Sequence, residues 1–255
     1  MANLRYVSKN YALNGTLRTP VPAADPSYPA SNLFQPDRYL VTSYPDSAGI
    51  DATYYLDLGS GGSRTIDVVG LLGLTQGDAL GLFPSYVYIR RGSVFPEDGT
   101  WSDVIMPINI AQNQRDPYYL LPSPLSDRYW KFQIGPTFNG FSLGNLLVGR
   151  LTDLGFNIAP GTGDSIVRQR TGNRTAMGQR SVSETGPPRY RLTMQFGALN
   201  PTQRAALEAM FLIAPVAMLH PTRGLMVADA DQDEVDGTVV FTDNFGASVS
   251  IEQLP

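Results

Sequence analysis

The chain has 255 residues, a formal net charge of -4 at neutral pH, no cysteine and a single histidine. These counts exclude disulfides, thiolate metal sites and thiol nucleophiles, and the net negative charge argues against a general nucleic-acid binder. The 25 glycines and 20 prolines, with only 16% charged residues, indicate short elements joined by turns and therefore a mainly β fold. Because no apolar run approaches the length of a membrane span and no apolar signal segment follows Met1, we expect a cytoplasmic origin and no membrane partner.

Residues 1–29 show little periodicity and contain two proline-rich stretches, 19–22 and 25–29. Such sequences favour extended backbone without regular pairing. We therefore expect an N-terminal extended arm that packs on a neighbour or forms part of a second domain.

Residues 30–152 contain several short segments in which apolar and polar residues alternate. A period of two is typical of half-buried strands, and we expect such strands at 52–58, from 66, at 85–91, at 128–134 and at 143–151. The clearest apolar faces are Ala52, Tyr54, Leu56 and Leu58 in the first segment and Trp130, Phe132 and Ile134 in the fourth. Turn-forming loops such as 96–99 separate them, so this range predicts one β-sandwich.

Residues 153–255 predict a second β domain, a sheet or barrel, that carries one amphipathic helix at about 201–213. A strand covers 189–196, and further strands are expected near 225–228, 238–242 and 247–253. Asn200 has the position of a helix N-cap, Pro201 the first helical position, and Gln203 completes a capping box. The predicted buried face of this helix comprises Ala206, Leu207, Met210, Phe211 and Ala214.

Two segments of opposite charge in this second domain are candidate contacts between subunits. Solvated surface is the alternative for both; the acidic segment could also bind a cation weakly, and the basic one could bind nucleic acid. The acidic segment lacks the glycine and the final glutamate of an EF-hand loop, which excludes that motif. The candidates are Arg168, Arg170, Arg174 and Arg180 on one side and Asp229, Asp231, Asp233 and Glu234 on the other.

Aromatic residues in predicted loops are candidate glycan contacts, because an aromatic ring can stack on the face of a sugar. They are Trp101, Tyr118 and Tyr119, and their alternative role is to fill the ends of the sandwich. His220 is expected to be structural, since one histidine cannot assemble a histidine metal site. No nucleophile motif of the Gly-x-Ser-x-Gly type is present, so we expect no catalytic residues, no metal and no cofactor.

Five segments together resemble a discoidin-like, galactose-binding-like jelly roll. They are Tyr28–Leu33, Tyr54–Gly59, Ile66–Leu71, Arg128–Ile134 and Gly144–Gly149. The resemblance implies that the predicted β-sandwich is a jelly roll.

The segments Arg168–Arg191, Leu192–Phe196 and Pro201–Phe211 resemble the C-terminal part of tail-tip proteins of long-tailed bacteriophages. This resemblance implies a non-enzymatic virion protein, a distal tail protein of the baseplate, that forms a homo-oligomeric ring, expected to be a hexamer, between the tail tube and the hub and fibres. Distal tail proteins commonly begin with their ring-forming domain, whereas here the jelly roll comes first, so we expect the arm and residues 153–255 to form the ring. The alternative is a carbohydrate-binding tail module that adsorbs to host glycans.

Overall fold

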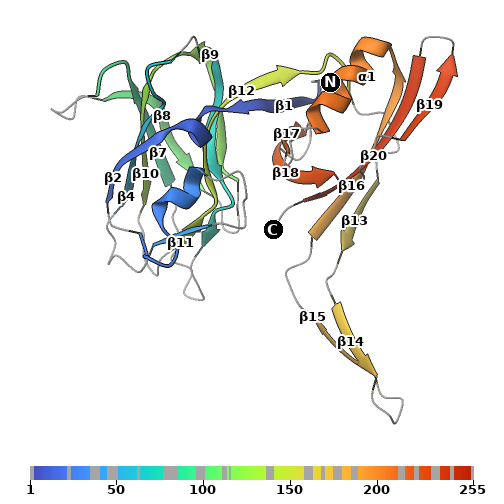
Figure 1. Ribbon diagram of the computed structural model, residues 1–255, viewed down its shortest axis with the longest axis horizontal. Coiled ribbons are helices and arrows are strands. Elements are labelled where there is room, and N and C mark those ends of the chain that lie inside the picture. Colours follow the sequence, from blue (N-terminus) through green and yellow to red (C-terminus); the bar gives the residue numbers. More distant parts are fainter. Residues whose placement is uncertain are drawn as a thin grey trace. The chain divides into compact units, whose positions relative to one another are not determined.

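The structure is a computed structural model that divides into two compact units, residues 7–151 (unit 2) and residues 1–6 with 152–255 (unit 1). It describes residues 3–21, 24–34, 41–44, 51–61, 64–76, 86–95, 101–110, 114, 116–135, 141–157, 163–167, 170–174, 180–184, 189–211, 216–220, 224–230, 236–241 and 244–253. Almost all described elements are strands, which confirms the predicted mainly β fold (Figure 1). No helix among these residues has the length and apolar character needed to cross a membrane.

Unit 2 is a β-sandwich, as the alternating segments predicted (Figure 1). Its first sheet has the order β2-β4-β10-β7-β8, and all four pairings are antiparallel. These strands are β2 (Thr16–Val21), β4 (Ala52–Asp57), β7 (Tyr86–Gly92), β8 (Ser102–Asn109) and β10 (Tyr129–Gly135). In the second sheet, β5 (Ile66–Leu72) pairs on one side with β12 (Asn145–Asp153) and on the other side with the edge strand β9 (Tyr118–Leu125). β1 (Arg5–Asn10) follows β12 in the sheet order.

The core of unit 2 lies between these two sheets. Its largest fully buried side chains are Trp130, Tyr54 and Phe132 from the first sheet, and Ile66 and Leu71 oppose them from the second. The alternating residues that the sequence placed on one face of β4 and β10 are therefore the residues that face this core. Burial of apolar surface, at roughly 25 cal/mol per Å², drives the two sheets together.

Smaller elements close unit 2 around the sandwich. β3 (Thr42–Tyr44), β11 (Phe141–Leu143) and β6 (Thr75–Gln76) form a three-stranded sheet, and two 3-10 helices, η1 (Tyr11–Asn14) and η2 (Ala30–Phe34), carry core residues. Asn145 is buried and donates from its side-chain amide to the Leu33 carbonyl at 3.1 Å, which fixes η2 to the start of β12.

The N-terminal segment differs from the expected extended arm of residues 1–29, because most of it pairs within unit 2. Thr16 and Leu17 of β2 are register partners of Asp57 and Leu56 in β4. The Asn10 side chain donates to the Leu146 carbonyl at 2.9 Å and accepts from the Val148 amide at 3.1 Å. Residues 7–29 therefore belong with the β-sandwich of unit 2, whereas residues 1–6 belong with 152–255.

The strands of unit 1 pair antiparallel. Their order is β13-β16-β20-β18-β17-β1, and β19 also pairs with β20. Its strands are β13 (Gly163–Val167), β16 (Arg189–Leu199), β17 (Val216–His220), β18 (Gly224–Ala230), β19 (Asp236–Phe241) and β20 (Asn244–Gln253).

Helix α1 (Pro201–Phe211) begins as the sequence predicted. The Asn200 side chain accepts from the Gln203 amide at 2.8 Å, and the Gln203 side chain accepts from the Asn200 amide at 3.0 Å, which is the reciprocal pattern of a capping box. Leu207 and Met210 are fully buried in the core of unit 1 with Met194 and Phe196 of β16. The predicted helix and the burial of Leu207 and Met210 are thereby confirmed, whereas the Phe211 side chain and Ala214, also predicted for the buried face, lie outside the described part of the chain.

A β-hairpin lies between β13 and β16 along the chain (Figure 1). It consists of β14 (Arg170–Arg174) and β15 (Arg180–Glu184), which pair antiparallel. β14 and β15 form a two-stranded sheet of their own, separate from the sheet that pairs β13 with β16. Within the described residues no third strand joins β14 or β15.

Candidate functional site

The outward face of the five-stranded sheet in unit 2 carries polar and aromatic residues in register. Because the core-facing residues of β4, β7 and β10 alternate with the others, the remaining residues of these strands point away from the core. Three rows result from the register: Asp57, Tyr129 and Gly92; Tyr55, Lys131 and Arg90; and Thr53, Gln133 and Tyr88. We call this surface the outer face.

A polar cluster of Asp51, Tyr86 and Gln133 lies at one end of the outer face. The Tyr86 hydroxyl donates to the Asp51 carboxylate, with oxygen–oxygen distances of 3.1 and 3.2 Å, and Gln133 Nε2 donates to Asp51 Oδ2 at 2.6 Å. Burial, followed by the nearby Asp51 charge, raises the pKa of Tyr86 above 10.0. The phenol is therefore neutral at physiological pH and holds the carboxylate in one orientation.

Gly135 makes room for this cluster at the end of β10. A Cβ atom at this position would collide with the Asp51 carboxylate and would lie 2.9 Å from the Tyr86 hydroxyl oxygen. The absence of a side chain at Gly135 thus allows Asp51 to approach the sheet and to bond two of its strands.

An aromatic cluster of Tyr55, Phe95, Trp101 and Tyr129 occupies the other end of the outer face. Phe95 is 5.9 Å from Tyr55, 5.7 Å from Trp101 and 5.7 Å from Tyr129, measured between ring centroids, and each pair is T-shaped. Tyr55 and Trp101 are 5.9 Å apart. Edge-to-face contacts of this kind add roughly 0.5–1.5 kcal/mol to area burial, so the rings support one another.

Lys131 stands between the two clusters. Its Nζ lies 5.6 Å from the centroid of the Tyr55 ring, within range of a cation–π interaction. Burial, and then the positive charge of Arg90, lower the pKa of Lys131 below 10.5, while the Asp51 charge acts in the opposite direction. The side chain of Lys131 is thus half-buried, and Arg90 is its register partner on β7.

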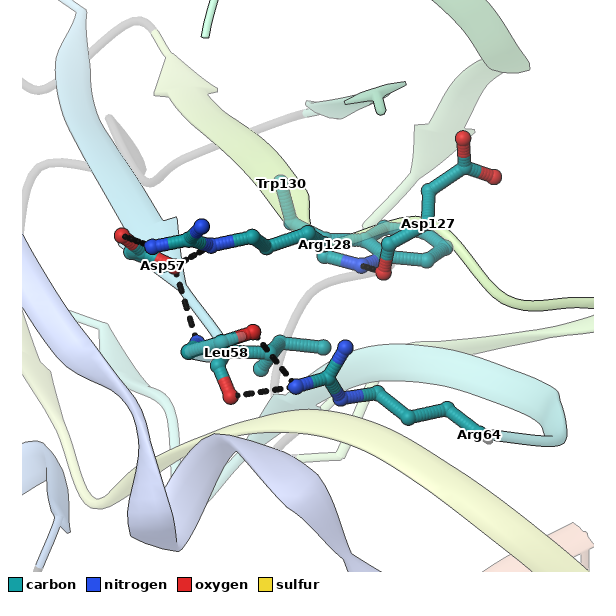
Figure 2. Close-up of polar contacts among 7 residues, drawn as sticks. Asp57, Leu58, Arg64, Asp127, Arg128 and Trp130 are labelled. Atoms are coloured by element: carbon teal, nitrogen blue, oxygen red, sulfur yellow. Dashed lines mark hydrogen bonds and ion pairs between the residues drawn. The ribbon is translucent and has the colours of Figure 1, made fainter. Parts of the chain in front are cut away.

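Arg128 and Asp57 form an ion pair at the end of β4 (Figure 2). Arg128 donates from Nε to Asp57 Oδ1 at 2.6 Å and from Nη2 to Asp57 Oδ2 at 2.9 Å, and its guanidinium lies 4.8 Å from the Tyr129 ring centroid. The hydrogen bond to Asp57 is the main reason why the pKa of Arg128 is raised. Arg64 donates to the Leu58 carbonyl at 2.8 Å, and Trp130 Nε1 donates to the Asp127 carbonyl at 3.0 Å (Figure 2).

Of the three aromatic residues proposed from the sequence as glycan contacts, the structure places only Trp101 on the outer face. Tyr118 and Tyr119 lie on β9, the edge strand of the opposite sheet, where Tyr118 is the register partner of Gly70. Tyr119 is 37% exposed and Tyr118 is half-buried. The three residues therefore do not form one cluster.

The proposed inter-subunit residues fall in unit 1. Arg170 and Arg174 lie on β14, Arg180 lies on β15 as the register partner of Arg174, and Asp229 lies on β18 as the partner of Glu252. The others, Arg168, Asp231, Asp233 and Glu234, lie outside the described residues, as does the predicted turn at 96–99. In the described part of the chain no three His, Cys, Asp or Glu residues form a group that could hold a metal ion.

The polar cluster and Lys131 were missed by the sequence analysis. Asp51 and Tyr86 are 35 residues apart, and Asp51 and Gln133 are 82 apart, so only the strand register brings them together. Lys131 could have been identified from the sequence, because it lies on the polar face of the alternating segment 128–134 and is one of only two lysines in the chain.

No protein-family model and no curated protein matches the chain. Several solved structures that resemble it are carbohydrate-binding modules. CBM32-1 from a family 31 glycoside hydrolase of Clostridium perfringens is 17% identical with a TM-score of 0.44, covering 56% of this chain and 99% of its own. Chitosan-binding module 1 from a chitosanase/glucanase of Paenibacillus sp. IK-5 is 19% identical with a TM-score of 0.43 and the same coverage. The lectin domain of lectinolysin, complexed with Lewis B antigen, is 14% identical with a TM-score of 0.40, covering 56% and 96%.

Proposed function

We propose that the protein binds carbohydrate and that the outer face of unit 2 is the binding surface. One observation carries the proposal: half-buried aromatic rings and hydrogen-bonding side chains stand in register on one face of a rigid sheet. Tyr55 and Tyr88 supply rings, while Gln133, Lys131 and Asp51 supply donors and acceptors. Sugar rings present apolar faces and hydroxyl edges, so they require both kinds of group close together.

The surface is prepared for binding because its side chains are held before any ligand arrives. Tyr86 and Gln133 orient Asp51, and Tyr86 lies 5.0 Å from Tyr88 in an edge-to-face contact. Phe95 and Trp101 support Tyr55. A surface that is already ordered loses little conformational entropy on binding, which favours affinity.

The test is a glycan array and calorimetry with the full chain and three variants. Tyr88→Ala and Trp101→Ala remove rings on the outer face, and each is expected to weaken binding at least tenfold. Tyr119→Ala removes an exposed tyrosine on the opposite sheet and serves as the matched control. Loss of binding only in Tyr119→Ala would move the site to β9, and a chain that binds no glycan would end the proposal.

The sequence resemblance of unit 1 implies a second role, which is assembly into the tail tip of a long-tailed phage. The hairpin β14–β15 favours this role. An isolated two-stranded hairpin is at best marginally stable in water, and no third strand supports this one among the described residues. Three of the four charged residues on β14 and β15 are arginines, whereas Asp229 and the following segment 231–236 are acidic. A neighbouring copy could therefore receive the hairpin through opposite charge.

Light scattering on the full chain tests this second role. We expect the mass of a closed oligomer, and because exposed ion pairs are screened by salt, we expect the oligomer to weaken in high salt. Arg174→Glu with Arg180→Glu should abolish the assembly, and Lys9→Glu, on β1, is the control for charge reversal. A monomer at all concentrations and salts would contradict an assembly role for the isolated protein.

A further inference from the structure

The polar cluster of the outer face directs its hydrogen-bond donors toward Asp51. The Tyr86 hydroxyl donates its one hydrogen to the Asp51 carboxylate, and Gln133 Nε2 donates to Asp51 Oδ2 at 2.6 Å. The raised pKa of Tyr86 keeps this hydrogen in place at physiological pH. Because the oxygen of a phenol also has lone pairs, Tyr86 can still accept a hydrogen bond. Toward a ligand, Tyr86 is therefore an acceptor.

The Asp51 carboxylate also keeps acceptor positions for a ligand. A carboxylate has roughly four lone-pair positions, which two donors do not fill. Asp51, Tyr86 and Gln133 are each half-buried, so part of each side chain is open to solvent. The Tyr86 hydroxyl oxygen and Asp51 Oδ1 are 3.1 Å apart. The cluster thus offers two neighbouring acceptor atoms on the outer face.

The position of these acceptors is fixed by the backbone of β10 as well as by hydrogen bonds. Gly135 is the register partner of Tyr86, and a Cβ atom at Gly135 would collide with the Asp51 carboxylate. Tyr88 is the register partner of Gln133, and its ring centroid lies 5.0 Å from that of Tyr86. An aromatic ring therefore stands directly beside the two acceptors.

We propose that Asp51 and Tyr86 accept hydrogen bonds from two neighbouring hydroxyl groups of a glycan, so that the outer face selects sugars whose hydroxyls are unsubstituted. This deepens the proposed carbohydrate binding and rests on it. Hydrogen bonds from a hydroxyl to a carboxylate are short and stronger than those between neutral groups. A sugar without the hydroxyl hydrogens would instead bring its oxygen lone pairs against the carboxylate and leave it unpaired. Tyr88 is placed to contact the face of the same sugar.

The experiment compares sugars with and without hydroxyl hydrogens by calorimetry on the full chain. The probes are β-1,4-linked trisaccharides of glucose, mannose and galactose, each with its fully O-methylated form. Methylation removes the donors but keeps the ring oxygens and the apolar faces. We expect at least one trisaccharide to bind about tenfold or more tightly than its methylated form, because bonds to a charged acceptor exceed neutral ones.

Two variants assign this preference to the cluster. Asp51→Asn keeps the size of the side chain but replaces one carboxylate oxygen with a donor. Gly135→Ala changes no polar group and displaces the carboxylate through its added Cβ atom. Each is expected to lower the affinity for the unsubstituted sugar about tenfold, toward that of the methylated form.

Each variant has a matched control in unit 2. Asp67→Asn removes a half-buried carboxylate of β5, in the opposite sheet, that accepts from the Leu151 amide at 3.1 Å. Gly61→Ala adds a Cβ atom where no described atom lies within 4 Å. Both controls should bind the unsubstituted sugar as the wild type does. Thermal melts of all four variants identify any loss that is caused by unfolding.

The outcomes separate this proposal from the proposed function. Equal binding of a sugar and its methylated form would overturn selection by hydroxyl groups while carbohydrate binding stands. A preference that survives in folded Asp51→Asn and Gly135→Ala would also overturn it, since the hydroxyls would then be recognised elsewhere. No binding of any sugar would remove the proposed function itself.

Discussion

The two faces of strand β10 differ in what they contribute to the protein. Trp130, Phe132 and Ile134 point inward and are fully buried in the sandwich core. Lys131 and Gln133, which alternate with them, are half-buried and belong to the outer face, where they contact residues of β4 and of the segment before it. Side chains alternate between the two faces of this strand. The residues that hold the sheets together are therefore the direct chain neighbours of the residues that we propose contact the ligand.

The largest expected effect is on the inner face. Trp130→Ala should lower the free energy of unfolding of unit 2 by about 3–5 kcal/mol, because it leaves a large cavity between the sheets. Urea denaturation followed by tryptophan fluorescence measures this, since Trp101 remains in unit 2 as a reporter. Lys131→Gln on the outer face should change the same quantity by no more than about 0.5 kcal/mol. Equal losses in the two variants would show that the two faces do not differ in this way.

An intermediate effect on stability is expected from the Asp57–Arg128 ion pair at the end of β4. Asp57→Asn keeps the size of the side chain but replaces a carboxylate that accepts two bonds from Arg128. We expect a lower melting temperature and a smaller loss than in Trp130→Ala, together with weaker glycan binding, because Tyr129 and its neighbours lose their support. Asp127→Asn, which removes the carboxylate of a different ion pair, the one with Arg91, is the comparison variant. A melting temperature unchanged by Asp57→Asn would show that this ion pair is not needed for stability.

The smallest expected effect concerns the polar cluster and depends on pH. The folded-state pKa of Tyr86 is raised above 10.0, so the contribution of its neutral hydroxyl is fully present below pH 10 and is lost as pH rises through the folded-state value. Tyr86→Phe should therefore be less stable than the wild type at pH 7, by about 1 kcal/mol or less on this solvent-accessible surface. Thermal melts between pH 7 and 11 should show this difference shrinking above pH 10. A difference that is constant over this range would contradict a role for the neutral phenol.

Some of the structure could be predicted because it depends on neighbours along the chain. The apolar alternation of β4 and β10, the capping box of Asn200 and Gln203, and the buried face of α1 all follow from local periodicity and local hydrogen bonds. These patterns determine which residues avoid water, whatever the remaining chain does. The mainly β fold and the single amphipathic helix were predictable for the same reason.

The candidate site was not predictable, because it depends on register between distant strands. The sequence analysis proposed Trp101, Tyr118 and Tyr119 together as glycan contacts, whereas the structure places Trp101 in the aromatic cluster of the outer face and Tyr118 and Tyr119 on the opposite sheet. Tyr86 and Gln133 meet at Asp51 only because β7 and β10 pair in one register; a shift of one residue would turn all their side chains to the other face. The sequence by itself determined the alternation of buried and exposed residues, and the tertiary structure decided which exposed residues stand side by side.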